Sequence, residues 1–146
     1  MKKLLYISLF LLAVSSCTLE TSDNGKLDGL WHLERIDTLQ TGGATDLSNE
    51  KIFWAVENKL LQFQGGPTGT FSFHFTNTGD SLILLSPYRS YGHEENGTGG
   101  DQQVMNPSVL KPYGVQRLEE HFFKESLKSS SMVLRSDSLR LYFKKF

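Results

Sequence analysis

Short alternations of apolar and polar residues constrain the fold more than any other feature of the sequence. In 70–76, Phe71, Phe73 and Phe75 alternate with Ser, His and Thr. Successive side chains on a strand point to opposite faces, so these rings share one face of a predicted strand. The segment 81–85 is apolar on both faces, which is typical of a strand in the middle of a sheet. The chain is therefore predicted to fold mainly as half-buried strands.

Several other segments have the same strand-like composition and are separated by turns rich in Gly, Asn, Asp and Ser. We expect further strands at 30–36, 51–64 (with a bend or bulge near Asn58), 121–127, 132–136 and 139–146. The series contains seven or eight short strands and no long amphipathic helix. This pattern predicts an all-β, antiparallel barrel or sandwich.

The segment 86–103 interrupts the series because it contains Pro87 and several Gly and Asn residues. We expect a long loop here, and long loops in compact domains are commonly functional or disordered. The segment 106–113 fits a single helical turn, with Asn106 before it and Pro107 at its first position. A second short helical turn is expected at 115–120.

Residues 1–16 have the composition of an export signal peptide. Lys2 and Lys3 precede an apolar run from Leu4 to Val14, and Ser15 and Ser16 follow it. A basic start, an apolar core of about 7–15 residues and a small-residue cleavage site are typical of such signals. The run is shorter than the roughly 20 apolar residues that a membrane-spanning helix needs.

The residues 14–17 (VSSC) resemble the lipobox of bacterial lipoproteins, in which an aliphatic residue and two small ones precede a Cys. The resemblance implies that Cys17 becomes the first mature residue and carries the lipid, which anchors the protein to a membrane. Cys17 is also the sole cysteine, so the domain contains no internal disulfide. The alternative is an ordinary secreted protein with an incidental cysteine.

Residues 17–27 are expected to form the lipidated end and a flexible tether, and 28–146 the folded domain. Without Lys2 and Lys3, 13 basic residues face 16 acidic ones, a net charge of −3. This balance disfavours nucleic-acid binding, which needs a basic face. We expect the protein in the cell envelope, at the outer membrane. Glu20 and Asp23 resemble a surface-export signal of some lipoproteins, although a solvated linker explains them as well.

The start of the domain carries a family resemblance. Gly29 and Trp31 open the first predicted strand and resemble the G-x-W signature of lipocalins and their calycin relatives. The resemblance implies a small lipocalin-like barrel in which Trp31 closes one end and a basic side chain of the last strand covers its ring. Arg140 is the predicted partner, with Arg135 as second choice. Taken whole, 27–146 is similar to lipocalin-like domains in short lipoproteins of gut anaerobes, although it is shorter than a typical lipocalin.

The sequence predicts a protein that is not an enzyme. It has no Gly-x-Ser-x-Gly nucleophile elbow, no phosphate loop and no dinucleotide fingerprint. The acid–His triplets 93–95 and 119–121 lack the spacing of a helical zinc site, and on a strand their neighbouring side chains diverge. We therefore predict no metal and no cofactor.

A small hydrophobic ligand inside the barrel is the main functional hypothesis, since barrel mouths commonly bind ligands. In a small barrel, however, side chains can fill the whole interior, and this alternative stays open. The predicted interior, and thus the candidate ligand-binding set, consists of Trp54, Phe71, Phe73, Phe75, Leu84 and Phe143.

A protein-interaction module is the rival hypothesis. Tyr88, Arg89 and Tyr91 lie in or near the predicted loop, and Tyr and Arg are enriched at interface hot spots. Separately, Thr38, Ser81 and Ser138 each follow an Asp and precede a Leu, which resembles an O-glycosylation sequon. Local hydrogen bonding at strand starts explains such Asp-Ser pairs equally well.

Overall fold

The computed structural model describes residues 22–91 and 100–146. Eight strands form a closed antiparallel ring in the order β10-β9-β8-β6-β5-β4-β3-β1, and β1 pairs with β10 to close it. Two short strands are attached outside the ring, β2 to β1 and β7 to β6. The prediction of an all-β barrel with short helical turns is therefore confirmed.

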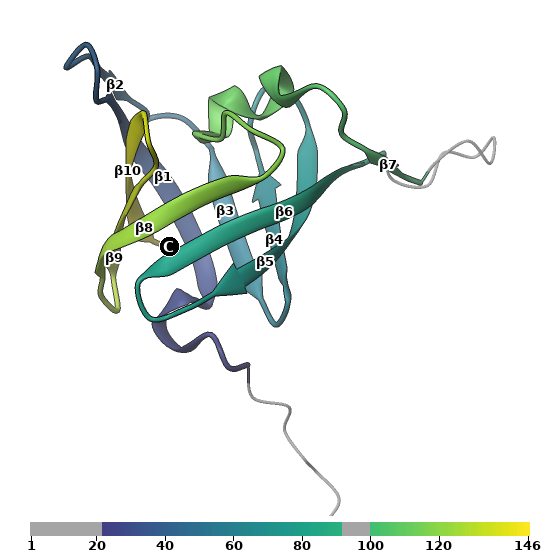
Figure 1. Cartoon of the computed structure of the whole chain (residues 1–146), viewed down its shortest axis with the longest axis horizontal. Coiled ribbons are helices and arrows are strands. Elements are labelled where there is room, and N and C mark those ends of the chain that lie inside the picture. The colour runs from purple at the N-terminus through teal and green to yellow at the C-terminus, as the bar shows by residue number, and fades with distance from the viewer. Residues whose placement is uncertain (1–21, 92–99) are drawn as a thin grey trace, which may run out of the picture.

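Figure 1 shows the arrangement of the elements along the chain. They are η1 (Gly25–Leu27), β1 (Gly29–Thr38), β2 (Ala44–Asp46), β3 (Phe53–Glu57), β4 (Leu60–Gln64), β5 (Thr70–Asn77), β6 (Ser81–Ser90), β7 (Asp101–Gln103), η2 (Pro107–Tyr113), β8 (Glu120–Leu127), β9 (Ser131–Arg135) and β10 (Leu139–Lys145).

The two 3₁₀ helices lie at opposite ends of the barrel (Figure 1). We call the end covered by η2 the lid end and the end where η1 leads into β1 the entry end. β1 runs from the entry end to the lid end. β3, β5 and β8 run in the opposite direction, so the turns that follow them, β3–β4, β5–β6 and β8–β9, lie at the entry end. Asn106 caps η2 by accepting the Ser108 N–H, and Pro107 occupies the first helical position as predicted.

Three sequence-based expectations are corrected by the structure. The segment 51–64 forms two strands joined by a tight hairpin turn, in which Asn58 has a φ of 53°. At the place where a bend or bulge is expected, the chain therefore reverses its direction completely. The segment 115–120 forms no helical turn. The sequence predicts Leu27 in the tether, yet it is fully buried in the core, so the fold includes η1.

The expected loop at 86–103 is also partly wrong, because β6 continues through Pro87 to Ser90. Between the pairs Ser72–Tyr88 and His74–Leu85, β6 has one residue more than β5, which is a β-bulge. Ser86 in this bulge has a φ of 50°. A bulge tolerates the proline because the ladder is locally interrupted. The rest of the predicted loop, 92–99, lies outside the described residues.

Candidate functional site

Aromatic side chains fill the middle of the barrel. The Trp54 ring lies 4.7 Å from Phe63 and 4.9 Å from Phe143, measured between centroids, and Phe63 lies 4.7 Å from Phe73. Of the predicted interior set, Trp54, Phe71, Phe73, Leu84 and Phe143 are buried, whereas Phe75 is partly exposed. The sequence therefore predicted these side chains on the inner face correctly, and at the centre they pack against one another.

The lid end is closed by hydrogen bonds that join η2 to distant strands and turns. The Tyr113 ring stacks on Phe63 with a centroid distance of 4.9 Å, and its hydroxyl donates to the Gly69 carbonyl. Trp54 Nε1 donates to the Tyr113 carbonyl at 3.1 Å. A Cβ on Gly66 would approach the Tyr113 ring to 2.4 Å, so glycine is required there. These contacts fix the lid to the core.

The entry end is closed around Trp31, as the lipocalin resemblance implies. Trp31 is fully buried, and its Nε1 donates to the Leu27 carbonyl at 2.8 Å. The cation over its ring is Lys145, whose Nζ lies 4.8 Å from the ring centroid and also donates to the Lys26 carbonyl. Gly29 has a φ of 126°, and a Cβ there would approach Lys145 Cε to 2.7 Å. The glycine thus makes room for the lysine.

The prediction that Arg140 covers Trp31 is wrong. Arg140 lies on the outer face and donates to Glu125 from Nε at 2.9 Å and from its terminal nitrogen at 3.0 Å. Arg135 lies 2.8 Å from the same carboxylate and packs on Phe123. The Arg140 hydrogen bond, with a smaller contribution from Arg135, lowers the pKa of Glu125. Leu139, Leu141 and Phe143 face inward, so alternation itself directs Arg140 outward and Lys145 inward.

A hollow of about 610 Å³ opens at the entry end beside η1. Its apolar wall is the ring of Phe75, the partly exposed member of the interior set. Asn24 holds one side of it by donating to the Asn58 carbonyl at 2.6 Å and to Asp28 Oδ1 at 2.8 Å. The residues that line it are Ser22, Asp23, Asn24, Asn58, Lys59, Phe75 and Asn77.

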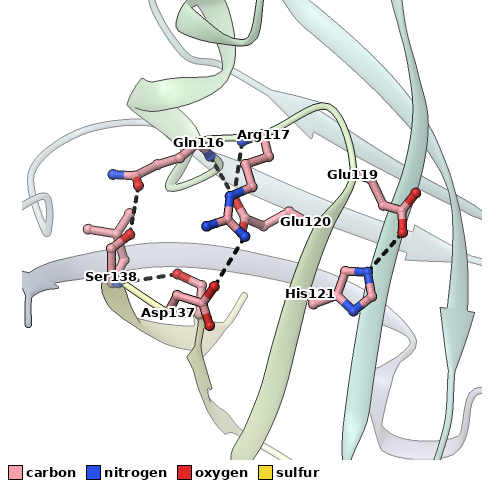
Figure 2. Close-up of polar contacts among 9 residues, drawn as sticks. Gln116, Arg117, Glu119, Glu120, His121, Asp137 and Ser138 are labelled. Carbon is pink, nitrogen blue, oxygen red and sulfur yellow. Dashed lines mark hydrogen bonds and ion pairs between the residues drawn. The ribbon is translucent and has the colours of Figure 1, made fainter.

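The Glu119–Glu120–His121 triplet does not converge on one point. Glu120 is buried and accepts the backbone N–H groups of Gln116 and Arg117 at 2.8 and 3.1 Å (Figure 2). Glu119 and His121 point the other way and contact each other at 2.9 Å. Glu120 thus satisfies the backbone of a segment that was expected to be helical. Nowhere in 22–91 or 100–146 do three His, Cys, Asp or Glu residues form a metal-binding group, and the triplet 93–95 lies outside these ranges.

The proposed interaction residues Tyr88, Arg89 and Tyr91 do not form one patch. The Arg89 guanidinium lies 5.0 Å from the Tyr91 ring centroid and 5.8 Å from the Phe71 ring centroid, near the lid end of the barrel. Tyr88 instead pairs with Ser72 and shares the outer face of the sheet with it. The bulge at Ser86 shifts the inward–outward alternation of side chains in β6, which the period of two in the sequence does not predict.

The three sequon-like positions lie at strand ends. Ser81 Oγ donates to Asp80 Oδ1 at 3.0 Å, and Ser138 Oγ donates to Gln116 Oε1 at 2.6 Å. Thr38 is the last residue of β1. The Ser81 contact is what the local hydrogen-bonding interpretation expects, whereas Ser138 bonds a residue that is distant in sequence. Among the described helices, none is long and apolar enough to cross a membrane, and Cys17 and the signal segment lie outside the described residues.

Known proteins share this architecture. A lipocalin-like protein from Bacteroides uniformis aligns with a TM-score of 0.59 at 18% identity, covering 84% of this chain and 100% of that one. An uncharacterized protein from Bacteroides eggerthii gives a TM-score of 0.59 at 17% identity, with 82% and 98% coverage. No curated protein matches the chain. The sequence profile of the lipocalin-like domain matches residues 10–146. The chain therefore belongs to the lipocalin-like domain family.

Proposed function

We propose that this chain is an envelope lipoprotein whose lipocalin-like domain binds small, partly apolar molecules at the entry end. The observation that supports this most directly is Phe75. Its ring belongs to the inner face of the barrel, yet it is partly exposed and borders a hollow of about 610 Å³. Ligand sites commonly have volumes of about 300–1,000 Å³, with an apolar wall and a few polar groups.

The polar rim of the hollow favours an amphiphilic ligand. The apolar part would contact Phe75, whereas Asp23 and Lys59 offer one charge of each sign at the edge. Asn24 and Asn77 are already engaged, the first with Asn58 and the second as acceptor for Lys124 Nζ at 2.7 Å. The filled centre limits the ligand to this end, so it would be shorter than one that occupies a whole barrel.

The binding test is calorimetry of the purified mature chain with medium-chain fatty acids and bile acids. Phe75→Ala should weaken binding about tenfold or more, which corresponds to about 1.4 kcal/mol. Phe123→Ala is the matched control, because Phe123 is also a partly exposed ring but lies on the outer face beside Arg135. Equal affinities for wild type and Phe75→Ala would contradict the proposed site.

The anchor is the second part of the proposal. The support is the lipobox-like residues 14–17 and the presence of a single cysteine at their end. We expect the native protein to carry acyl chains on Cys17, because two or more chains give stable membrane attachment. Intact-mass measurement of the native protein tests this, and Cys17→Ala should shift the protein from the membrane to the soluble fraction. An unmodified native mass would contradict it.

A protein-interaction role has one specific observation in its favour. Tyr91 is 43% exposed and packs on Arg89 near the rim of the lid end. Pull-down from cells with wild-type protein and with Tyr91→Ala separates this role from ligand binding. Loss of a partner in the variant would favour the interaction role, and an unchanged set of partners would count against it.

A further inference from the structure

The outer face of the barrel carries a further hollow surface, which adjoins the entry-end hollow at the β3–β4 hairpin. Two adjoining depressions of about 490 and 260 Å³ lie on the outer side of β3, β4, β5 and β6 and share Leu60 and His74. We call this surface the outer groove. It is lined by Ala55, Glu57, Asn58, Lys59, Leu60, Gln62, Gln64, Ser72, Phe73, His74, Tyr88 and Asp101.

The sheet register explains why a groove forms here. Ala55 pairs with Gln62, Gln62 with Ser72, and Ser72 with Tyr88, so these residues form one row across four neighbouring strands. The row points outward, because Trp54, Leu61, Phe63, Phe71 and Phe73 on the same strands are buried. Ala55 and Ser72 are small, so the longer side chains beside them form the walls of the depression.

The polar groups in the groove are ordered. Gln64 Nε2 donates to Gln62 Oε1 at 2.7 Å, and Gln62 Nε2 lies 3.4 Å from Ser72 Oγ. A glutamine amide has two N–H donors and an acceptor oxygen, and a serine hydroxyl both donates and accepts. The chain of contacts therefore fixes the orientation of both amides and still leaves donors and acceptors for a ligand that carries both kinds of group.

The charges and the apolar groups narrow the class of ligand. Charged residues lie at the edges, with Glu57 and Lys59 at one end and Asp101 at the other, so the middle of the groove carries amides and hydroxyls. Asp101 already accepts a hydrogen bond from Ser90 Oγ at 3.0 Å. Leu60 is 45% exposed and lies beside the rings of His74 and Tyr88. Apolar and aromatic side chains next to ordered amides suit a ring-shaped molecule that has C–H groups on its flat faces and hydroxyl groups around its edge.

We propose that the outer groove binds a short, uncharged oligosaccharide. A sugar ring presents C–H groups on its faces, which fit Leu60 and the aromatic rings, and hydroxyl groups at its edges, which fit Gln62, Gln64 and Ser72. Each hydroxyl both donates and accepts, as the two glutamine amides do. The β-bulge at Ser86 contributes by placing Tyr88 on the outer face next to Ser72.

This site differs from the entry-end hollow in position and ligand chemistry. The two hollows share Asn58 and Lys59, at the hairpin between β3 and β4, whereas Phe75 belongs to the entry-end hollow and Gln62 to the outer groove. Substitutions of Phe75 and Gln62 therefore separate the two proposals.

The experiment is a titration of the purified mature chain, labelled with ¹⁵N, with cellotetraose, maltotetraose, xylotetraose and mannotetraose. The amide resonances of β3, β4, β5 and β6 should shift with at least one of these probes at about 1 mM, a concentration that detects weak binding. An oligogalacturonate serves as the anionic comparison and should bind more weakly. Absence of shifts with all four neutral probes would overturn the proposal.

Variants confirm the position. Gln62→Ala removes the central amide and should weaken binding about tenfold, and Ala55→Leu fills the groove and should do the same. Both side chains point away from the core, and an unchanged thermal midpoint verifies that each variant is folded. Tyr142→Ala is the control, because Tyr142 lies on another part of the outer face, beside Arg35. If Phe75→Ala lost saccharide binding while Gln62→Ala kept it, the saccharide site would lie at the entry end, and the proposal would be overturned.

Discussion

The two ends of the barrel are closed by different means. At the lid end, η2 is joined to the core by a stacked Tyr113 and by hydrogen bonds to Gly69 and Trp54, and the rings below it are fully buried. At the entry end, Trp31 and Lys145 seal one side, while a hollow remains beside Phe75. The lid end therefore contributes mainly to stability, whereas the entry end leaves an open hollow next to the core.

Among the substitutions that test this difference, Tyr113→Ala should have the largest effect on stability. It removes a buried ring from the lid end and should lower the free energy of unfolding by about 3–5 kcal/mol, as for other large aromatic truncations. Urea unfolding followed by tryptophan fluorescence measures the change. Tyr113→Phe keeps the ring and loses the hydroxyl that donates to Gly69, so it should cost about 1 kcal/mol. Equal costs for the two variants would show that the ring does not hold the lid.

Glu120→Ala tests the segment that connects the lid to β8. The buried carboxylate accepts the N–H groups of Gln116 and Arg117, so its removal should cost about 2 kcal/mol. Glu119→Ala is the matched control, because Glu119 contacts an exposed His121 and should change stability by less than about 1 kcal/mol. Chemical denaturation of the two variants measures the contrast, which would disappear if the Glu120 contacts were incidental.

Lys145→Gln tests the closure of the entry end. Loss of the cation over Trp31 should cost about 0.5–2 kcal/mol. Arg140→Gln lies on the same strand, but it removes a surface ion pair with Glu125, which solvent screens, so it should cost less than Lys145→Gln. The free energies of unfolding of both variants decide which residue closes the barrel, and a larger loss for Arg140→Gln would reverse the assignment.

The smallest expected effect is a pH dependence from His32, on the outer face of β1 opposite the start of β3. Burial lowers the pKa of His32, but hydrogen bonds to the Glu50 carbonyl and to Glu34 raise it more, so the net shift is upward. Because the folded protein holds the proton more tightly, this contribution to stability is fully present below the ordinary His pKa of 6.5 and is lost as the pH rises through the folded pKa.

Thermal unfolding of the wild type and of His32→Gln from about pH 5 to pH 9 measures this contribution, since His titrates in that range. The wild type should lose part of its advantage over the variant as the pH rises. A constant difference in midpoint across the range would show that the protonated ring adds nothing to stability.

Much of the barrel could be predicted from alternation alone. The inward residues of β5 and β10 follow directly from the period of two, and the same period, applied strictly to β10, would have selected Lys145 in place of Arg140. The backbone contacts of Glu120 are local, to residues four and three positions earlier, but they require a non-helical segment where a helical turn is expected from the sequence. The bulge at Ser86 could not be predicted, because it depends on the register between β5 and β6. The outer groove was missed for the same reason, since it exists only across four paired strands.

The pairing of β1 with β10 also determines how the chain can be rearranged. The Phe146 N–H donates to the Leu30 carbonyl at 2.8 Å, so the last residue lies beside the start of the first strand. A short linker could therefore join Phe146 to the residues before η1, and new termini could be opened in the exposed turn at 128–130. Such a circular permutant would keep every strand pair of the ring while moving the chain ends from one seam of the barrel to another.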